Sequence, residues 1–150
     1  MRYLLLLSSL YIVPAVTTAQ TSLDGAWEGE MIVGGIYGTE RLPVQMFITL
    51  DDGMVTGRTY IKLPDGELVQ MNLTGRMYRD RSMEMVETDY VGSEDNAYFP
   101  LFNRQYQLIY KPDLFDSELQ GFWQEVTEDT FNKFRKRGRM RLRKVEVKGA

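Results

Sequence analysis

The stretch ERLPVQMFITLDDGMVTGRTYIKL, residues 40–63, contains two strand patterns separated by a turn signal. Every second residue from Leu42 to Leu50 is apolar, whereas the residues between them are mixed. This period of two is typical of a β-strand with one buried face. The residues 51–53, Asp-Asp-Gly, favour a tight turn, so the second pattern predicts an antiparallel neighbour.

The same reading, extended in both directions, predicts further strands with mostly short connections and no helix of ordinary length. The expected strands are 25–33, 40–50, 54–63, 67–78, 82–91, 104–111, 119–126 and 138–147. Eight consecutive strands joined by turns favour an all-β fold, an eight-stranded antiparallel up-and-down barrel, because closure removes the sheet edges. An open sandwich of two sheets is the alternative.

The first residues have the layout of a secretory signal peptide. Arg2 precedes an apolar run from Tyr3 to Val13, and small residues follow as far as Ala19. The run is too short for a permanent membrane span. We therefore expect residues 1–19 to be a signal peptide and residues 20–150 to form a single β-barrel domain, secreted or periplasmic after cleavage.

The chain has neither cysteine nor histidine, and both absences restrict its chemistry. Without cysteine no disulfide can stabilise the domain, so packing and strand pairing must do so. Without histidine the commonest general base and the commonest zinc ligand are missing. We expect no catalytic residues, no metal site and no cofactor, and a binding role rather than an enzyme. Catalysis by a pair of carboxylates is the alternative that these absences leave open.

The only two tryptophans, Trp27 and Trp123, each follow a glycine by two residues. A glycine at this spacing is expected to leave room for the indole to cross onto a neighbouring strand. One interpretation makes both tryptophans plugs of the core, and the other has at least one of them touch a ligand.

Gly25 and Trp27 on the first expected strand resemble the first motif of the lipocalins and their wider calycin relatives. Thr88–Tyr90 is similar to the start of the second motif, and Arg104 stands where the third motif has an arginine. The resemblance implies that Trp27 closes the base of a barrel beneath a ligand cavity.

Strand parity places several large apolar side chains on one interior. We predict that the ligand-binding residues are Trp27, Val44, Met46, Ile48, Tyr106, Leu108 and Trp123. The function expected from them is the binding of a small apolar or amphipathic molecule. The alternative is a non-enzymatic structural or interaction protein of the cell envelope whose barrel is filled.

Two pairs of acidic residues each share one face of an expected strand: Glu87 with Asp89, and Glu28 with Glu30. We expect both pairs to be solvated on the outer face.

Charge is divided unevenly along the chain. Residues 20–132 contain eight basic and twenty acidic residues, whereas residues 133–148 contain nine basic and one acidic. If the last strand closes the barrel against the first, the arginines at 139, 141 and 143 should lie beside Glu28 and Glu30. The alternative use of Arg139, Arg141 and Arg143 is an anionic surface partner. An acidic exported protein is a poor candidate for nucleic-acid binding.

The leader gives a first prediction. The exported protein should begin at Gln20, because the small residues Thr17 and Ala19 precede the expected cleavage site. N-terminal sequencing of protein recovered from its own host checks this. Recovery of exported chains that retain residues 1–19 would instead identify the leader as an anchor.

Overall fold

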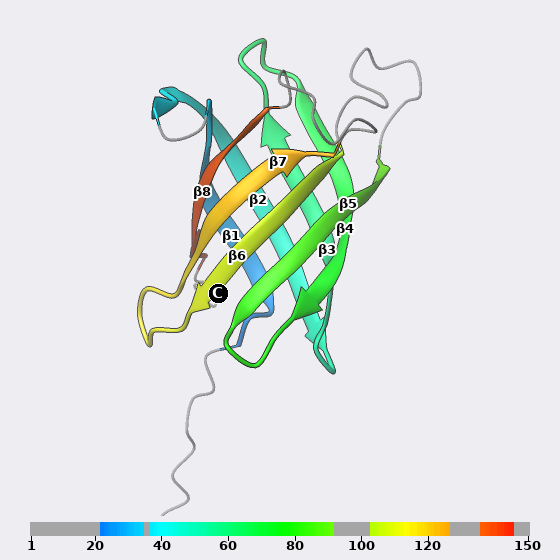
Figure 1. Ribbon diagram of the computed structural model, residues 1–150, viewed down its shortest axis with the longest axis vertical. Coiled ribbons are helices and arrows are strands. Elements are labelled where there is room, and N and C mark those ends of the chain that lie inside the picture. The colour runs from blue at the N-terminus through cyan, green and yellow to red at the C-terminus, as the bar shows by residue number, and fades with distance from the viewer. Residues whose placement is uncertain (1–21, 35–36, 92–102, 127–135, 146–150) are drawn as a thin grey trace, which may run out of the picture.

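The computed structural model describes residues 22–34, 37–91, 103–126 and 136–145, and the leader lies outside them. The described residues form one closed antiparallel barrel with the strand order β1-β2-β3-β4-β5-β6-β7-β8 (Figure 1). The strands are β1 Gly25–Val33, β2 Glu40–Asp51, β3 Met54–Lys62, β4 Leu68–Met77, β5 Ser82–Tyr90, β6 Arg104–Lys111, β7 Glu118–Glu125 and β8 Arg137–Lys144.

Closure of the barrel confirms the up-and-down architecture over the open sandwich. Every strand pairs with the next, and β1 also pairs antiparallel with β8 from Trp27↔Lys144 to Val33↔Gly138. Each backbone edge is thereby matched with a neighbour, as a closed sheet requires. Of the expected last segment, 138–147, only the part with regular apolar alternation pairs in the barrel, because β8 finishes at Lys144, where that alternation breaks.

The barrel has two ends, which we name by the strands that finish there. The mouth is the end where β1, β3, β5 and β7 finish, and it lies uppermost in Figure 1. The base is the opposite end, where β1 begins at Gly25. The interior between them is packed with aliphatic, methionine and aromatic side chains, many of them fully buried. Methionine suits such a core because its flexible side chain fills irregular space.

The seam between β1 and β8 has the predicted register, with Glu28 opposite Arg143 and Glu30 opposite Arg141. The ion pairs, however, run to the outer neighbours of the seam. Glu30 lies 2.6 Å from Arg41 on β2, and Arg141 lies 2.5 Å from Glu118 on β7. Each outward side chain on β1 or β8 has a neighbouring strand on both sides. The strand register therefore predicted which acidic and basic residues lie near one another, but not which of them form ion pairs.

The two glycines that precede the tryptophans have different roles, and neither provides the room expected for an indole. Gly25 has φ of +128°, which side-chain-bearing residues rarely adopt. Gly121 faces inward, where a Cβ would lie 2.0 Å from the carbonyl oxygen of Gln107 on β6. The room beside Trp123 comes instead from Gly138, its partner across the strand pair.

Close approach of strands at inward glycines recurs around the barrel. A Cβ at any of five positions would lie within 2.1 Å of a carbonyl oxygen on the adjacent strand: Gly29, Gly57, Gly75, Gly121 and Gly138. Small barrels need strongly bent strands, and glycine permits the bend because no side chain separates the two backbones.

Gly138 supplies a test of this packing. A Cβ there would lie 1.6 Å from the Ile32 carbonyl oxygen and 3.0 Å from Trp123 Nε1. Gly138→Ala should therefore lower the free energy of unfolding by roughly 1–3 kcal/mol, the usual cost of overpacking. Denaturant titration measures it, with Thr56→Ala on the outer face of β3 as control. Equal stability of the Gly138→Ala variant and the wild type would refute the close approach.

Candidate functional site

A cluster of four polar side chains is buried in the barrel beneath the mouth. It consists of Thr59 on β3, Glu87 on β5, and Arg104 and Tyr106 on β6, none more than 3% exposed. The Glu87 carboxylate accepts hydrogen bonds from Thr59 Oγ1 at 2.8 Å and from Tyr106 Oη at 2.5 Å. It also accepts one from the Arg104 backbone N–H at 3.1 Å and lies 3.4 Å from the Arg104 guanidinium. A buried carboxylate needs such a set of donors.

Strand parity explains why Glu87 lies inside, and the outward placement predicted for it was wrong. Met83, Met85 and Glu87 follow one another on the inner face of β5. The register with β4 then shifts: Leu73 pairs with Glu87, but Met71 pairs with Tyr90. This bulge inserts an extra residue and leaves Asp89 exposed, so Glu87 and Asp89 form no acid pair. The parity of the two methionines was the signal in the sequence that could have placed Glu87 correctly.

Burial changes the acid–base properties of two members of the cluster. Desolvation raises the pKa of Glu87, against the opposing effects of the Arg104 charge and of the hydrogen bonds from Tyr106 and Thr59. Desolvation and the neighbouring carboxylate also raise the pKa of Tyr106 well above its ordinary value. Tyr106 is therefore a neutral hydrogen-bond donor to Glu87 at physiological pH.

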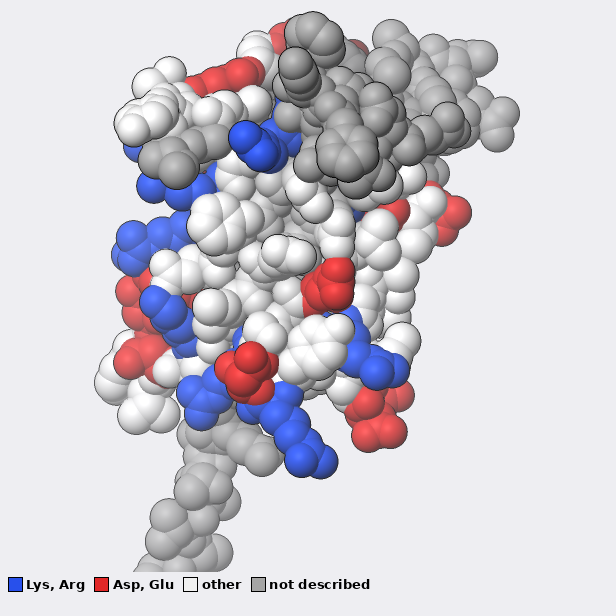
Figure 2. Space-filling view, viewed as in Figure 1, with Lys and Arg blue, Asp and Glu red and all other residues white. Residues whose placement is uncertain are grey.

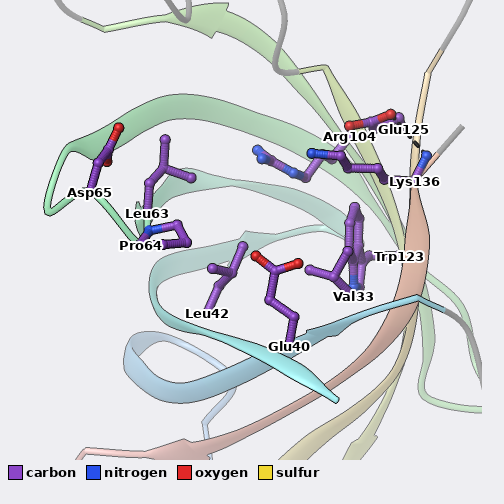
Figure 3. Close-up of a pocket in the computed structure, with 10 residues that line it drawn as sticks. All are labelled: Val33, Glu40, Leu42, Leu63, Pro64, Asp65, Arg104, Trp123, Glu125 and Lys136. Atoms are coloured by element: carbon purple, nitrogen blue, oxygen red, sulfur yellow. Dashed lines mark hydrogen bonds between the residues drawn. The ribbon is translucent and has the colours of Figure 1, made fainter. Parts of the chain in front are cut away.

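A pocket of about 360 Å³ opens at the mouth, above this cluster (Figure 3). Apolar and charged side chains line it together: Val33, Glu40, Leu42, Leu63, Pro64, Asp65, Arg104, Trp123, Glu125 and Lys136. This volume lies at the lower end of the range for small-molecule sites.

Arg104 connects the buried cluster to the mouth pocket. Its guanidinium carbon lies 5.8 Å from the centre of the Trp123 ring, a cation–π distance. The Trp123 indole N–H in turn donates to the Ile32 carbonyl oxygen at 3.0 Å. Glu87 below and Trp123 beside it thus hold a positive charge at the floor of the pocket.

All seven residues predicted to bind a ligand are buried inside the barrel. Trp123 lines the mouth pocket. The other six, Trp27, Val44, Met46, Ile48, Tyr106 and Leu108, belong to the packed core and do not line that pocket. Sequence parity identified the interior but did not identify Arg104, Leu63 or Glu40, because a pocket forms where several strand ends and turns meet.

Trp27 fills the opposite end of the barrel. Its indole N–H donates to the Leu23 carbonyl oxygen at 2.9 Å, and its ring meets Tyr110 edge-on at 5.9 Å. The ammonium of Lys144 lies 5.8 Å from the centre of the same ring. Trp27 therefore closes the base, but packed core side chains lie above it in place of the ligand cavity that the resemblance implied. Arg104 lies at the mouth, beside Trp123.

The predicted arginine row lies on the outer face of β8. Figure 2 shows basic side chains along the β8 side of the barrel, interspersed with acidic ones. Arg141 and Arg143 both contact Glu118, and Arg143 also approaches Asp116 to 3.6 Å. The hydrogen bond from Arg141 lowers the pKa of Glu118. Part of the basic charge is thus neutralised within the protein.

Within the described residues, no three or more acidic side chains come close enough to hold a metal ion. The same part of the chain contains no helix long and apolar enough to cross a membrane.

Comparisons of the chain with protein-family models, with curated proteins and with solved structures gave no match. The barrel architecture is therefore established by the strand pairing, and membership of the lipocalins is not.

The buried carboxylate gives a prediction for pH dependence. Because the folded-state pKa of Glu87 is raised, its favourable contribution is present below the ordinary value of 4.5 and is lost as pH rises through the folded pKa. The free energy of unfolding of the wild type, minus that of Glu87→Gln, should fall over this window and then level off. Denaturant titrations across pH measure the difference, with Glu84→Gln on the outer face of β5 as control. A difference that increases with pH would contradict the assignment.

Proposed function

We propose that the protein is a small barrel that binds an apolar or amphipathic molecule at its mouth, in the manner of a lipocalin-like carrier. The single observation that carries this proposal is the 360 Å³ pocket, whose walls include Val33, Leu42, Leu63 and Trp123. Apolar walls combined with a few fixed polar groups are typical of small-molecule sites. On this proposal the protein acts without catalysis or cofactor after export.

The packed interior supports a shallow binding mode. Trp27 and Met46 are fully buried against other core side chains, as is Tyr106. Protein interiors at native density do not admit a ligand without repacking. We therefore propose that Trp123 contacts the ligand directly, and that the six deeper residues support the pocket from below.

The alternative is an interaction protein with a filled barrel, and the same packed interior favours it. On this proposal the binding surface lies outside, where Arg139, Arg141 and Arg143 follow β8 and Phe122 is 62% exposed on β7. Neutralisation of two of the arginines by Glu118 weighs against an anionic partner. Probe binding at the mouth separates the two proposals.

The neutral fluorescent probe N-phenyl-1-naphthylamine tests the mouth pocket. It should bind with about 1:1 stoichiometry and enhanced emission, because Leu63 and Trp123 offer apolar surface. Leu63→Gln should raise the Kd about tenfold, which corresponds to about 1.4 kcal/mol. Fluorescence titration measures both variant and wild type.

Leu114→Gln provides the matched control, because Leu114 is 69% exposed in the turn at the base. It should leave the Kd unchanged. Near-ultraviolet circular dichroism checks that each variant keeps its packed core. No probe binding by folded wild-type protein, or equal loss in both variants, would favour the filled-barrel alternative.

A further inference from the structure

Charge is distributed in two groups around the mouth pocket. Arg104 from β6 and Lys136, next to the start of β8, extend into the pocket from one side (Figure 3). Glu40, the first residue of β2, directs its carboxylate into the pocket from across it. Both basic groups thus lie on one side of the pocket, where Glu125 is next to Lys136, and Glu40 lies on the other side.

The other two acids of the lining are engaged in local backbone contacts. Asp65 accepts a hydrogen bond from the Glu67 backbone N–H at 3.1 Å, which stabilises the turn after β3. Glu125 accepts one from the Lys136 backbone N–H at 2.9 Å. Among the described residues, the Glu40 carboxylate and the Lys136 ammonium make no hydrogen bond or ion pair. Both groups line the pocket, where a ligand could contact them.

Arg104 is well suited to receive an anionic group. It is 3% exposed yet lines the pocket, and Glu87 and Trp123 hold its side chain in place. A guanidinium fixed in this way loses little entropy on binding, and its planar donors match a carboxylate. Lys136 adds a second, more flexible positive charge at the same wall.

A ligand with a single charge meets a mismatch in this pocket. An anion alone would lie near the Glu40 carboxylate, and a cation alone would lie near Arg104 and Lys136. Such like-charge contacts cost more in a partly enclosed site than in water, because the effective dielectric constant is lower. Repulsion of the wrong charge contributes to specificity as attraction of the right one does.

The walls between the charged groups are apolar. Val33, Leu42 and Trp123 line this part of the pocket and offer no hydrogen-bonding group except the indole N–H, which is bonded to Ile32. A short hydrocarbon linker between two charged ends matches this pattern, and the pocket volume suits a molecule of that size.

Building on the proposed function, we infer that the mouth pocket selects a small zwitterion. Its anionic group lies against Arg104 and Lys136, its cationic group lies against Glu40, and its apolar linker lies along Trp123.

Three probes of one skeleton test the inference: 6-aminohexanoate, hexanoate and hexylamine. Competition with N-phenyl-1-naphthylamine on the mature chain measures each Kd, and 4-aminobutanoate and 8-aminooctanoate cover shorter and longer charge separations. The best zwitterion should bind at least tenfold more tightly than hexanoate or hexylamine, because it alone satisfies both walls.

Single substitutions locate the two charged contacts. Glu40→Gln should weaken the zwitterion about tenfold and leave hexanoate binding unchanged or tighter. Lys136→Gln should weaken the zwitterion and hexanoate but not hexylamine. Glu67→Gln and Lys62→Gln are the matched controls, because both residues are exposed near the same end and neither lines the pocket.

The outcomes separate this inference from the proposed function. Equal affinity for hexanoate and every zwitterion, or a preference that survives Glu40→Gln, would overturn the inference while leaving the pocket as an apolar site. If no charged probe displaces the bound fluorophore, the inference of a zwitterion site is also overturned, and the pocket remains an apolar site. Failure of the fluorophore itself to bind would remove the proposed function as well.

Discussion

Antiparallel pairing of β1 with β8 is the constraint on which the rest of this protein depends. Because the chain has no cysteine, no disulfide can hold the barrel closed. Closure instead pairs the two edges that an eight-stranded sheet would otherwise expose, from Trp27↔Lys144 to Val33↔Gly138. It also makes the inside of the barrel an enclosed space, in which most inward side chains are buried.

The close approach of adjacent strands around this space explains the glycines on the inner face. Glycines at inward positions let neighbouring backbones come nearer than a Cβ would allow, and Gly138 does so opposite Trp123. The two tryptophans then occupy opposite ends, with Trp27 at the base and Trp123 at the mouth. Each indole N–H is bonded to a backbone carbonyl oxygen, so both large rings are buried without an unsatisfied donor.

Because the barrel is closed, the Glu87 carboxylate is buried away from water. A carboxylate in the core requires compensation, and Thr59, Tyr106 and Arg104 provide it from two other strands. The same contact fixes the Arg104 guanidinium beneath the mouth, where it forms part of a pocket wall. Arg104 therefore has two roles: it compensates the buried Glu87 carboxylate, and it lines the proposed binding pocket. The proposal places binding at the mouth because the pocket opens there and the interior is packed.

The sequence by itself determined where the strands lie and most of the residues on their inward faces. Alternation and turn residues are local signals, and they sufficed to place Trp27, Met46 and Tyr106 in one interior and to predict the seam register of Glu30 with Arg141. Local signals failed where position depends on several segments at once. The bulge in β5 separated Glu87 from Asp89, and Arg141 and Arg143 of β8 contacted Glu118 rather than the seam glutamates. The mouth pocket was likewise decided only by the tertiary structure, because Glu40, Arg104 and Lys136 are distant in sequence and meet only when the closed barrel brings their strand ends together.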